Sequence, residues 1–135
     1  MKLKKCLTSV DVKNIIRSAE NEALKNNWSV TIAVVDDGGH LMALQRLDGA
    51  APLSSYISIA KAKTASLGQK ETKIFEDMIN NGRFAFLSVP YVDGTLEGGV
   101  PIIIDGICIG AVGVSGVKSD QDVQVARVGI KVLSS

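Results

Sequence analysis

The sequence has few of the residues that stabilise small secreted domains or build metal centres. Among its 135 residues are two cysteines, three prolines and one histidine, and aromatic residues make up 4%. Cys6 and Cys108 lie far apart without a paired spacing, so we expect reduced thiols in a cytoplasmic protein. With His40 as its one histidine, a single subunit cannot build a multi-histidine metal cage, and we predict no metal site.

The chain also lacks an excess of either charge and any long apolar run. Its 15 Lys and Arg residues oppose 14 Asp and Glu residues, giving a net charge of +1. This charge provides no strong field for a polyanion, so nucleic-acid binding is not expected. No apolar run approaches the roughly 18 residues of a membrane span, and no signal-peptide core follows the basic start. We therefore predict a cytoplasmic protein with neither nucleic-acid nor membrane partners.

What the sequence does contain is typical of one globular domain spanning residues 1–135. Hydrophobic periodicity predicts helices over about 9–26, 53–67, 70–81 and 119–133. Short β-branched runs predict strands over 30–35, 40–47, 100–104 and 107–114, with a further short strand near 84–88. Asp105-Gly106 is typical of a type I′ hairpin turn. The order predicts an α+β fold with a largely antiparallel sheet.

The last helix carries two further expectations. Ser119 with Asp122 three residues later resembles a capping box. The helix is apolar on more than one side, which favours burial against another subunit over a helix enclosed in its own small core.

Two groups of polar residues are candidates for ligand contacts. Arg46 and Asp48 follow the second strand, where the arginine could hold a carboxylate or phosphate, or the two could pair and only stiffen the turn. The middle helix contributes Ser54, Lys61 and Lys63. Because two helical steps turn by about 200°, Lys61 and Lys63 face different directions, and one could meet a ligand while the other is solvated.

Glycines form the third group, at 94, 98, 99, 110, 113 and 116. Gly110, Gly113 and Gly116 do not make a dinucleotide fingerprint, because the first of them sit in a hairpin strand and no acidic residue follows about 20 residues later. Glycine within a strand instead indicates a bulge or a close approach of ligand or backbone, here at Gly98 and Gly99. Ser115 and Gly116 could hold an anion on free N–H groups. We interpret His40 as a surface-turn histidine, and neither cysteine has a visible base, so we predict no catalytic residue.

An ordered set of segments resembles the GlcG/HbpS family. The segments are 34–41, ending in Asp-Asp-Gly-Gly-His-Leu, then Arg-Leu-Asp-Gly-Ala at 46–50, Lys-Ala-Lys-Thr-Ala at 61–65, Gly-Gly-Val-Pro-Ile at 98–102, Gly-Ala-Val-Gly-Val-Ser-Gly at 110–116 and Gln121-Asp122. The resemblance spans about residues 8–133. It implies a profilin-like sandwich whose five-stranded antiparallel sheet carries packed helices, assembled as a dimer or a higher oligomer such as an octamer.

The resemblance also implies a function. The family includes haem-binding proteins, products of glycolate and diol or glycerol utilisation clusters, and a domain of corrinoid adenosyltransferases. It implies a non-catalytic protein that binds a small anionic ligand, with haem or another tetrapyrrole as candidate. Haem iron takes a His, Cys, Met or Tyr ligand. The first predicted helix has no histidine and His40 sits on a turn, which leaves Met42, Met78, Tyr56 and Tyr91 as candidates, with nothing in the sequence to select one. Two alternatives stay open: an accessory enzyme of these pathways or of haem degradation using Lys61 and Asp48, and a chaperone-like oligomer that protects a partner enzyme.

Overall fold

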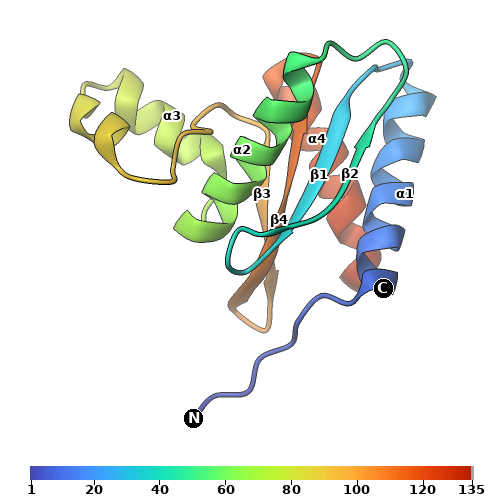
Figure 1. Cartoon of the computed structure of the whole chain (residues 1–135), viewed down its shortest axis with the longest axis horizontal. Helices are drawn as coiled ribbons and strands as arrows, with labels where there is room; N and C mark the ends of the chain where they lie inside the picture. The colour runs from blue at the N-terminus through green and yellow to red at the C-terminus, as the bar shows by residue number, and fades with distance from the viewer. Residues whose placement is uncertain (135) are drawn as a thin grey trace.

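The computed structural model describes residues 1–134 and forms a three-layer arrangement around one sheet (Figure 1). The α-helices are α1 (Ser9–Lys25), α2 (Leu53–Gly68), α3 (Thr72–Asn80) and α4 (Ser119–Lys131), and the short 3₁₀ helices are η1 (Phe84–Ser88) and η2 (Val132–Ser134). The strands are β1 (Thr31–Asp36), β2 (Leu41–Arg46), β3 (Gly99–Ile104) and β4 (Ile107–Ser115). These bounds agree with the predicted helices and with four of the predicted strands.

The sheet is antiparallel in the order β2-β1-β4-β3, so the two hairpins lie side by side through β1 and β4. Helices α1 and α4 cover one face, where the larger core includes Ile15, Ile32 and Val112. Helix α2 covers the other face over a smaller core that includes Ala33, Ala62 and Ala111. Figure 1 shows these layers, with β1 enclosed between them. The continuous apolar run of β1 is therefore explained by burial on both faces.

The expected five-stranded sheet is wrong for the described residues, in which the sheet has four strands. The segment near 84–88, predicted as a short strand, forms the 3₁₀ helix η1. Phe86 of η1 stacks on Phe75 of α3, with ring centroids 5.0 Å apart. This aromatic contact holds η1 against α3, and the two helices project to one side of the sandwich (Figure 1).

The predicted capping box of the last helix is also wrong. The backbone N–H of Lys118 donates to Gln121 Oε1, whereas the carboxyl group of Asp122 points into the protein. The apolar strips of α4 are satisfied within this chain, because Val123, Val125 and Ala126 all belong to the larger core. Among the described residues, no apolar face of α4 is left uncovered, so the structure gives no support to the prediction that this helix is buried against another subunit.

Close packing of α2 on the sheet explains several glycines. A Cβ atom on Gly113 of β4 would lie 2.1 Å from the Ser58 carbonyl oxygen and 2.5 Å from the Ala62 nitrogen. A Cβ atom on Gly94 would likewise lie 2.2 Å from the carbonyl carbon of Ala60. These glycines permit the close backbone approach that their positions in strand and loop predicted. Within residues 1–134, no helix is long and apolar enough to cross a bilayer.

Candidate ligand-binding site

Lys61 is directed into the protein and forms a buried ion pair. Its Nζ atom lies 3.2 Å from Asp122 Oδ2 and donates to the Val114 carbonyl oxygen at 2.9 Å. Both charged side chains are only 3% exposed. Since Lys61 lies on α2, Val114 on β4 and Asp122 on α4, one ammonium group joins three elements from both sides of the sheet.

Burial raises the pKa of Asp122 to about 6, against the opposing effect of the Lys61 charge. The backbone N–H of Val117 also donates to this carboxylate, at 3.3 Å. The glycines next to the pair leave space for it: a Cβ atom on Gly98 would lie 2.5 Å from Lys61 Nζ, and one on Gly99 would lie 2.4 Å from the Lys61 carbonyl oxygen. Lys61, Asp122 and the two glycines therefore pack closely in this part of the interior.

Three further predicted site residues lie on the same side of the sheet. The Ser54 hydroxyl is buried and lies 2.7 Å from Thr31 Oγ1. Ser115 is buried and pairs with Thr31 in the β1–β4 ladder. Gly116 has a φ of 144°, and a Cβ atom there would lie 2.5 Å from the Ser29 carbonyl oxygen. The structure therefore engages Ser54, Ser115 and Gly116 in contacts between its own elements.

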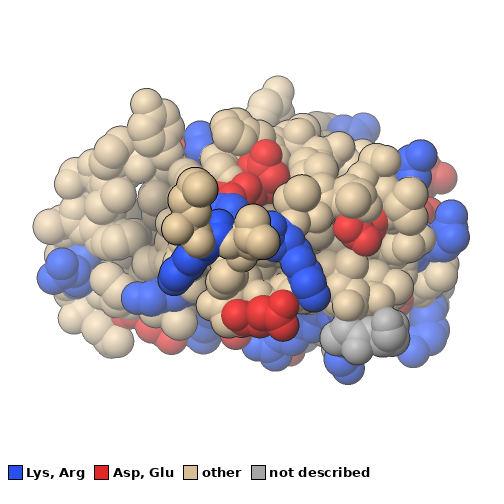
Figure 2. All heavy atoms as spheres, turned by 90° about the horizontal axis from the view of Figure 1, so that it is seen from below, with Lys and Arg blue, Asp and Glu red and all other residues tan. Residues whose placement is uncertain are grey.

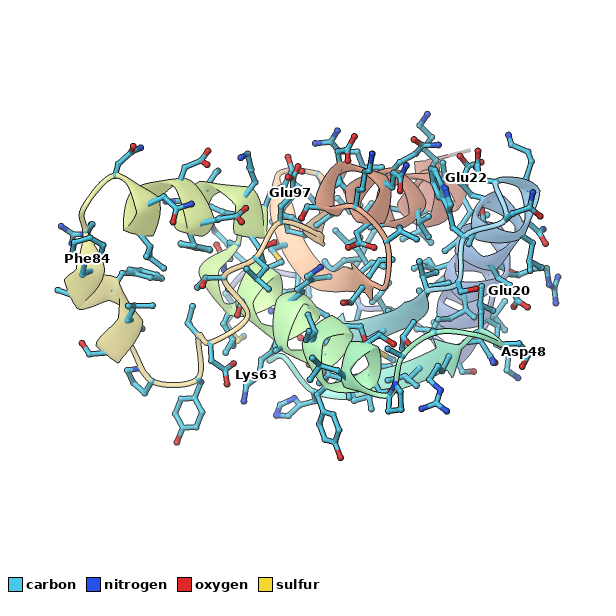
Figure 3. All side chains as sticks on the ribbon, turned by 90° about the horizontal axis from the view of Figure 1, so that it is seen from above. Glu20, Glu22, Asp48, Lys63, Phe84 and Glu97 are labelled. Atoms are coloured by element: carbon cyan, nitrogen blue, oxygen red, sulfur yellow. The ribbon has the colours of Figure 1, made fainter. Side chains whose placement is uncertain are left out.

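Lys63, in contrast, faces outward from α2 (Figure 3). Its ammonium group lies 5.0 Å from the centroid of the exposed Tyr91 ring. No carboxylate of residues 1–134 pairs with it. A hollow of about 390 Å³ lies beside it, bordered by residues that include Tyr56, Ile59 and Asp93. The two lysines of α2 thus face opposite directions, as their spacing predicts.

Arg46 and Asp48 are exposed near the end of β2, and neither has an ion-pair partner within the described residues. They border a groove of about 530 Å³, together with residues that include Glu20 and Trp28. Figure 3 shows Asp48 and Glu20 at this end of the molecule. The alternative in which Arg46 and Asp48 pair to stiffen the turn is not what the structure shows.

Arg46 also shares a sheet face with α2. It is opposite Thr31 in the β1–β2 ladder, and Thr31 contacts Ser54 of α2. Because partners across a ladder project to the same face, the Arg46 side chain lies on the α2 side of the sheet. Leu44 of β2 and Ile59 of α2 pack against the same small core between them.

We call this surface the α2–β2 face, defined by Leu41, Leu44 and Arg46 of β2 and Tyr56, Ile59 and Lys63 of α2. It has an apolar centre with a cation toward each end. Leu41 is 49% exposed and Tyr56 is 76% exposed, although neither carries a charge. Leu53, Tyr56, Ala60, Lys63 and Leu67 recur at helical spacing along the exposed side of α2. The covered side of α2 is built from small and polar residues, whereas its uncovered side carries the large apolar side chains of Leu53, Tyr56 and Leu67. An uncovered apolar side is typical of a helix that meets a ligand or a partner.

Charges elsewhere are interspersed. Figure 2 views the end of the molecule that carries the two hairpin turns, and basic and acidic side chains alternate there. Lys4 pairs with Asp37, and Lys5 lies 3.4 Å from Asp105. This arrangement agrees with the near-zero net charge.

Sequence reasoning missed three contacts. Asp122 was assigned to a helix cap, although its partner Lys61 lies 61 residues earlier. Tyr91 lies in an irregular loop with no periodic signal, and its contact with Lys63 depends on the tertiary fold. The hydrogen bond between Asp36 and His40 could have been found, because a tight turn after a strand brings residues four apart together.

The fold and the face together define a class: a small α+β sandwich that presents an apolar, cation-flanked helix surface. Comparison with known proteins identifies it further. Residues 7–131 match the family model described as "Haem degrading protein HbpS-like", and the chain belongs to this family. It is 56% identical to Protein GlcG of Escherichia coli K12 over 115 residues, covering 85% of each chain.

Solved structures agree with this assignment. A double mutant of Streptomyces reticuli HbpS superposes with a TM-score of 0.89 at 30% identity, covering 98% of this chain and 90% of that one. A structure described as a PduOC:haem complex superposes with a TM-score of 0.85 at 27% identity, covering 94% of each chain. The fold is therefore shared by a relative that was solved with haem.

Proposed function

We propose that this protein binds haem or a related tetrapyrrole on the α2–β2 face, as a non-catalytic accessory to glycolate or to diol and glycerol utilisation in the cytoplasm. The observation that carries the proposal is the pairing of an exposed apolar centre with two unpaired cations, Arg46 and Lys63. The haem complex of a structural relative supports the choice of ligand.

The chemistry of the face fits a tetrapyrrole. A flat apolar macrocycle gains about 25 cal/mol for each Å² of apolar surface removed from water, and the exposed side chains Leu41 and Tyr56 offer such contacts. The peripheral carboxylates of haem need cations, and a charge-assisted hydrogen bond from Lys63 or Arg46 supplies one. When bound, haem would supply its iron for ligand binding or electron transfer.

The remaining predicted site residues have supporting positions in this proposal. Asp48 lies at the rim of the groove next to Arg46. We propose that the buried contacts of Ser54, Lys61, Gly98, Gly99, Ser115 and Gly116 fix α2 and the adjoining strands, and thereby set the shape of the face.

The geometry of the site does not favour the accessory-enzyme alternative. It requires Lys61 and Asp48 to act together on a substrate. Lys61 is buried and its carboxylate partner is Asp122, whereas Asp48 is exposed at the end of β2. We therefore retain binding as the function.

We also propose a homo-oligomer, a dimer or a higher assembly such as an octamer, with a profilin-like fold in each subunit. The projecting α3–η1 arm supports the assembly, because Phe84 and Leu87 of η1 are exposed although they are large and apolar. Exposed apolar patches of this kind are typical of protein–protein contacts.

The binding proposal is tested by titrating the protein with haem and following the Soret band. We expect saturable binding at micromolar haem, weakened by up to about fivefold by Lys63→Ala and by Arg46→Ala, as for the loss of an exposed ion pair. Lys73→Ala is the matched control, because this lysine pairs with Asp77 on α3, away from the face. The absence of any spectral change for the wild-type protein at micromolar haem would overturn the proposal.

A further inference from the structure

We propose that His40 is the axial ligand of the iron in haem bound on the α2–β2 face, with its ring positioned by Asp36. This inference rests on the proposed haem binding and adds the iron ligand. The observation behind it is that the turn between β1 and β2 fixes one nitrogen of the imidazole and leaves the other nitrogen directed outward.

The Asp36 carboxylate holds the Nδ1 side of the ring. His40 Nδ1 lies 3.1 Å from Asp36 Oδ1 and 3.2 Å from Oδ2. The same Asp36 oxygen accepts hydrogen bonds from the backbone N–H groups of Gly38 and His40, so the carboxylate is held in the turn. A carboxylate accepts hydrogen bonds, so this contact engages an N–H on Nδ1 and leaves Nε2 available for another partner.

The turn also provides a seat for the ring. A Cβ atom on Gly38 would lie 2.6 Å from His40 Cε1 and 2.9 Å from Nδ1. Only glycine at position 38 therefore leaves room for the imidazole ring in this position. The His40 side chain is 80% exposed. Within residues 1–134, no group hydrogen-bonds Nε2. The structure thus positions the imidazole through Nδ1 and leaves Nε2 without a partner among the described residues.

This imidazole lies beside the proposed ligand face. A Cβ atom on Gly39, the residue before His40, would lie 3.1 Å from Lys63 Cγ and 3.3 Å from Leu67 Cγ of α2. Leu41, the residue after it, belongs to the face itself. Ser66 of α2 donates to the Asp36 carbonyl oxygen at 2.6 Å and ties the turn to the helix. An iron ligand and a cation for a haem carboxylate therefore come from adjacent elements.

The hydrogen-bonding arrangement matches what metal-bound histidines require. Such a histidine donates its second ring N–H to a carboxylate or carbonyl, which fixes the tautomer and raises the basicity of the ligating nitrogen. Haem iron accepts a neutral imidazole of this kind as a proximal ligand. Asp36 is accordingly a positioning residue, and His40 is the residue that would contact the iron.

The test uses the full chain loaded with ferric haem and compares wild type, His40→Ala and Asp36→Asn by absorption and electron paramagnetic resonance. We expect His40→Ala to retain the fold by circular dichroism but to lose the imidazole-ligated spectrum, with added free imidazole restoring it. Asp36→Asn keeps the acceptor oxygen for the turn but loses the charge, and should weaken haem binding about tenfold. Met42→Ala, at a nearby exposed thioether, is the control and should retain the wild-type spectrum.

The outcomes separate this inference from the binding proposal. If wild type and His40→Ala bind haem with identical spectra, the ligand assignment is wrong although haem binding stands. If Met42→Ala instead loses the wild-type spectrum, the thioether is the ligand and the assignment is again wrong. If wild-type protein does not bind haem, both proposals fall.

Discussion

Lys61 Nζ lies 3.2 Å from Asp122 Oδ2 in the interior, where it also donates to the Val114 carbonyl oxygen. This pair links α2 on one side of the sheet to α4 on the other. Two buried charges are stable together only when each has hydrogen-bond partners, and here the backbone supplies one to each charge. The pair therefore fixes the position of α2, whose outer side forms the proposed ligand face.

Removing one member of the pair should destabilise the protein strongly. Lys61→Met leaves the Asp122 charge buried and uncompensated, and breaking such a pair costs about 3–5 kcal/mol. The double variant Lys61→Met with Asp122→Leu removes both charges and should recover much of that loss. Urea unfolding of the two single variants and the double variant measures this coupling. Additive losses in the double variant would contradict a coupled ion pair.

The same carboxyl group should make stability depend on pH. Because burial raises the pKa of Asp122 to about 6 in the folded protein, above its ordinary value of 3.8, the folded state binds the proton more tightly than the unfolded state. The contribution of this group to the free energy of unfolding should therefore fall as the pH rises from about 4 through 6.

Comparison with Asp122→Asn isolates this effect, because asparagine does not titrate. Unfolding free energies of wild type and variant should differ by an amount that changes between about pH 4 and 6 and levels off above pH 6, in measurements from pH 4 to 7.5. The exposed neighbour variant Asp120→Asn is the control and should follow wild type closely. A difference independent of pH would show that Asp122 does not titrate in this range.

The packing of α2 predicts that a substitution at Gly113 lowers the stability of the protein. A Cβ atom there would meet backbone atoms of Ser58 and Ala62 that cannot move without displacing the helix. Gly113→Ala should therefore lower stability by about 1–3 kcal/mol or more through overpacking, and should weaken ligand binding as α2 shifts.

Gly106→Ala provides the contrast. Its Cβ would meet nothing within 4 Å, but Gly106 has a φ of 76°. Its cost, about 1–2 kcal/mol, would come from backbone conformation alone and should leave binding unchanged. Thermal unfolding together with haem titration separates the two variants. Equal binding by Gly113→Ala and wild type would contradict the proposed coupling of α2 packing to the face.

The projecting arm predicts an effect on assembly. Phe84→Ser and Leu87→Ser replace exposed apolar side chains, so they should lower the mass observed by light scattering while leaving the circular dichroism spectrum unchanged. The matched control is Leu24→Ser, an exposed apolar side chain on α1. A monomeric wild-type protein at all concentrations would contradict the proposed oligomer.

Local signals predicted the fold well. The Asp105-Gly106 turn, with φ values of 52° and 76°, needs only two residues that tolerate positive φ, and the sequence shows both. The helix cap at Thr8 is equally local, since Asp11 lies three residues away. Turns and helix caps can be predicted from the sequence because the residues that form them are close together along the chain.

Long-range partners were harder to predict. Asp122 fits a capping pattern by spacing, but a partner 61 residues away determines its orientation. The predicted strand near 84–88 is apolar enough for a sheet, yet it forms η1 and its Phe86 stacks on Phe75. The two lysines of α2 show the same limit: Lys61 is buried and Lys63 is half-buried because only one side of α2 meets the sheet, and the sequence does not specify which side that is.

The most direct test of the account is to map the ligand onto the structure by nuclear magnetic resonance. Diamagnetic gallium(III) protoporphyrin, added to isotope-labelled protein, should shift amide resonances of β2, of the turn that carries His40 and of the exposed side of α2 around Lys63. Shifts confined to the groove that includes Trp28 and Glu20, or no shifts at saturating porphyrin, would contradict binding on the α2–β2 face.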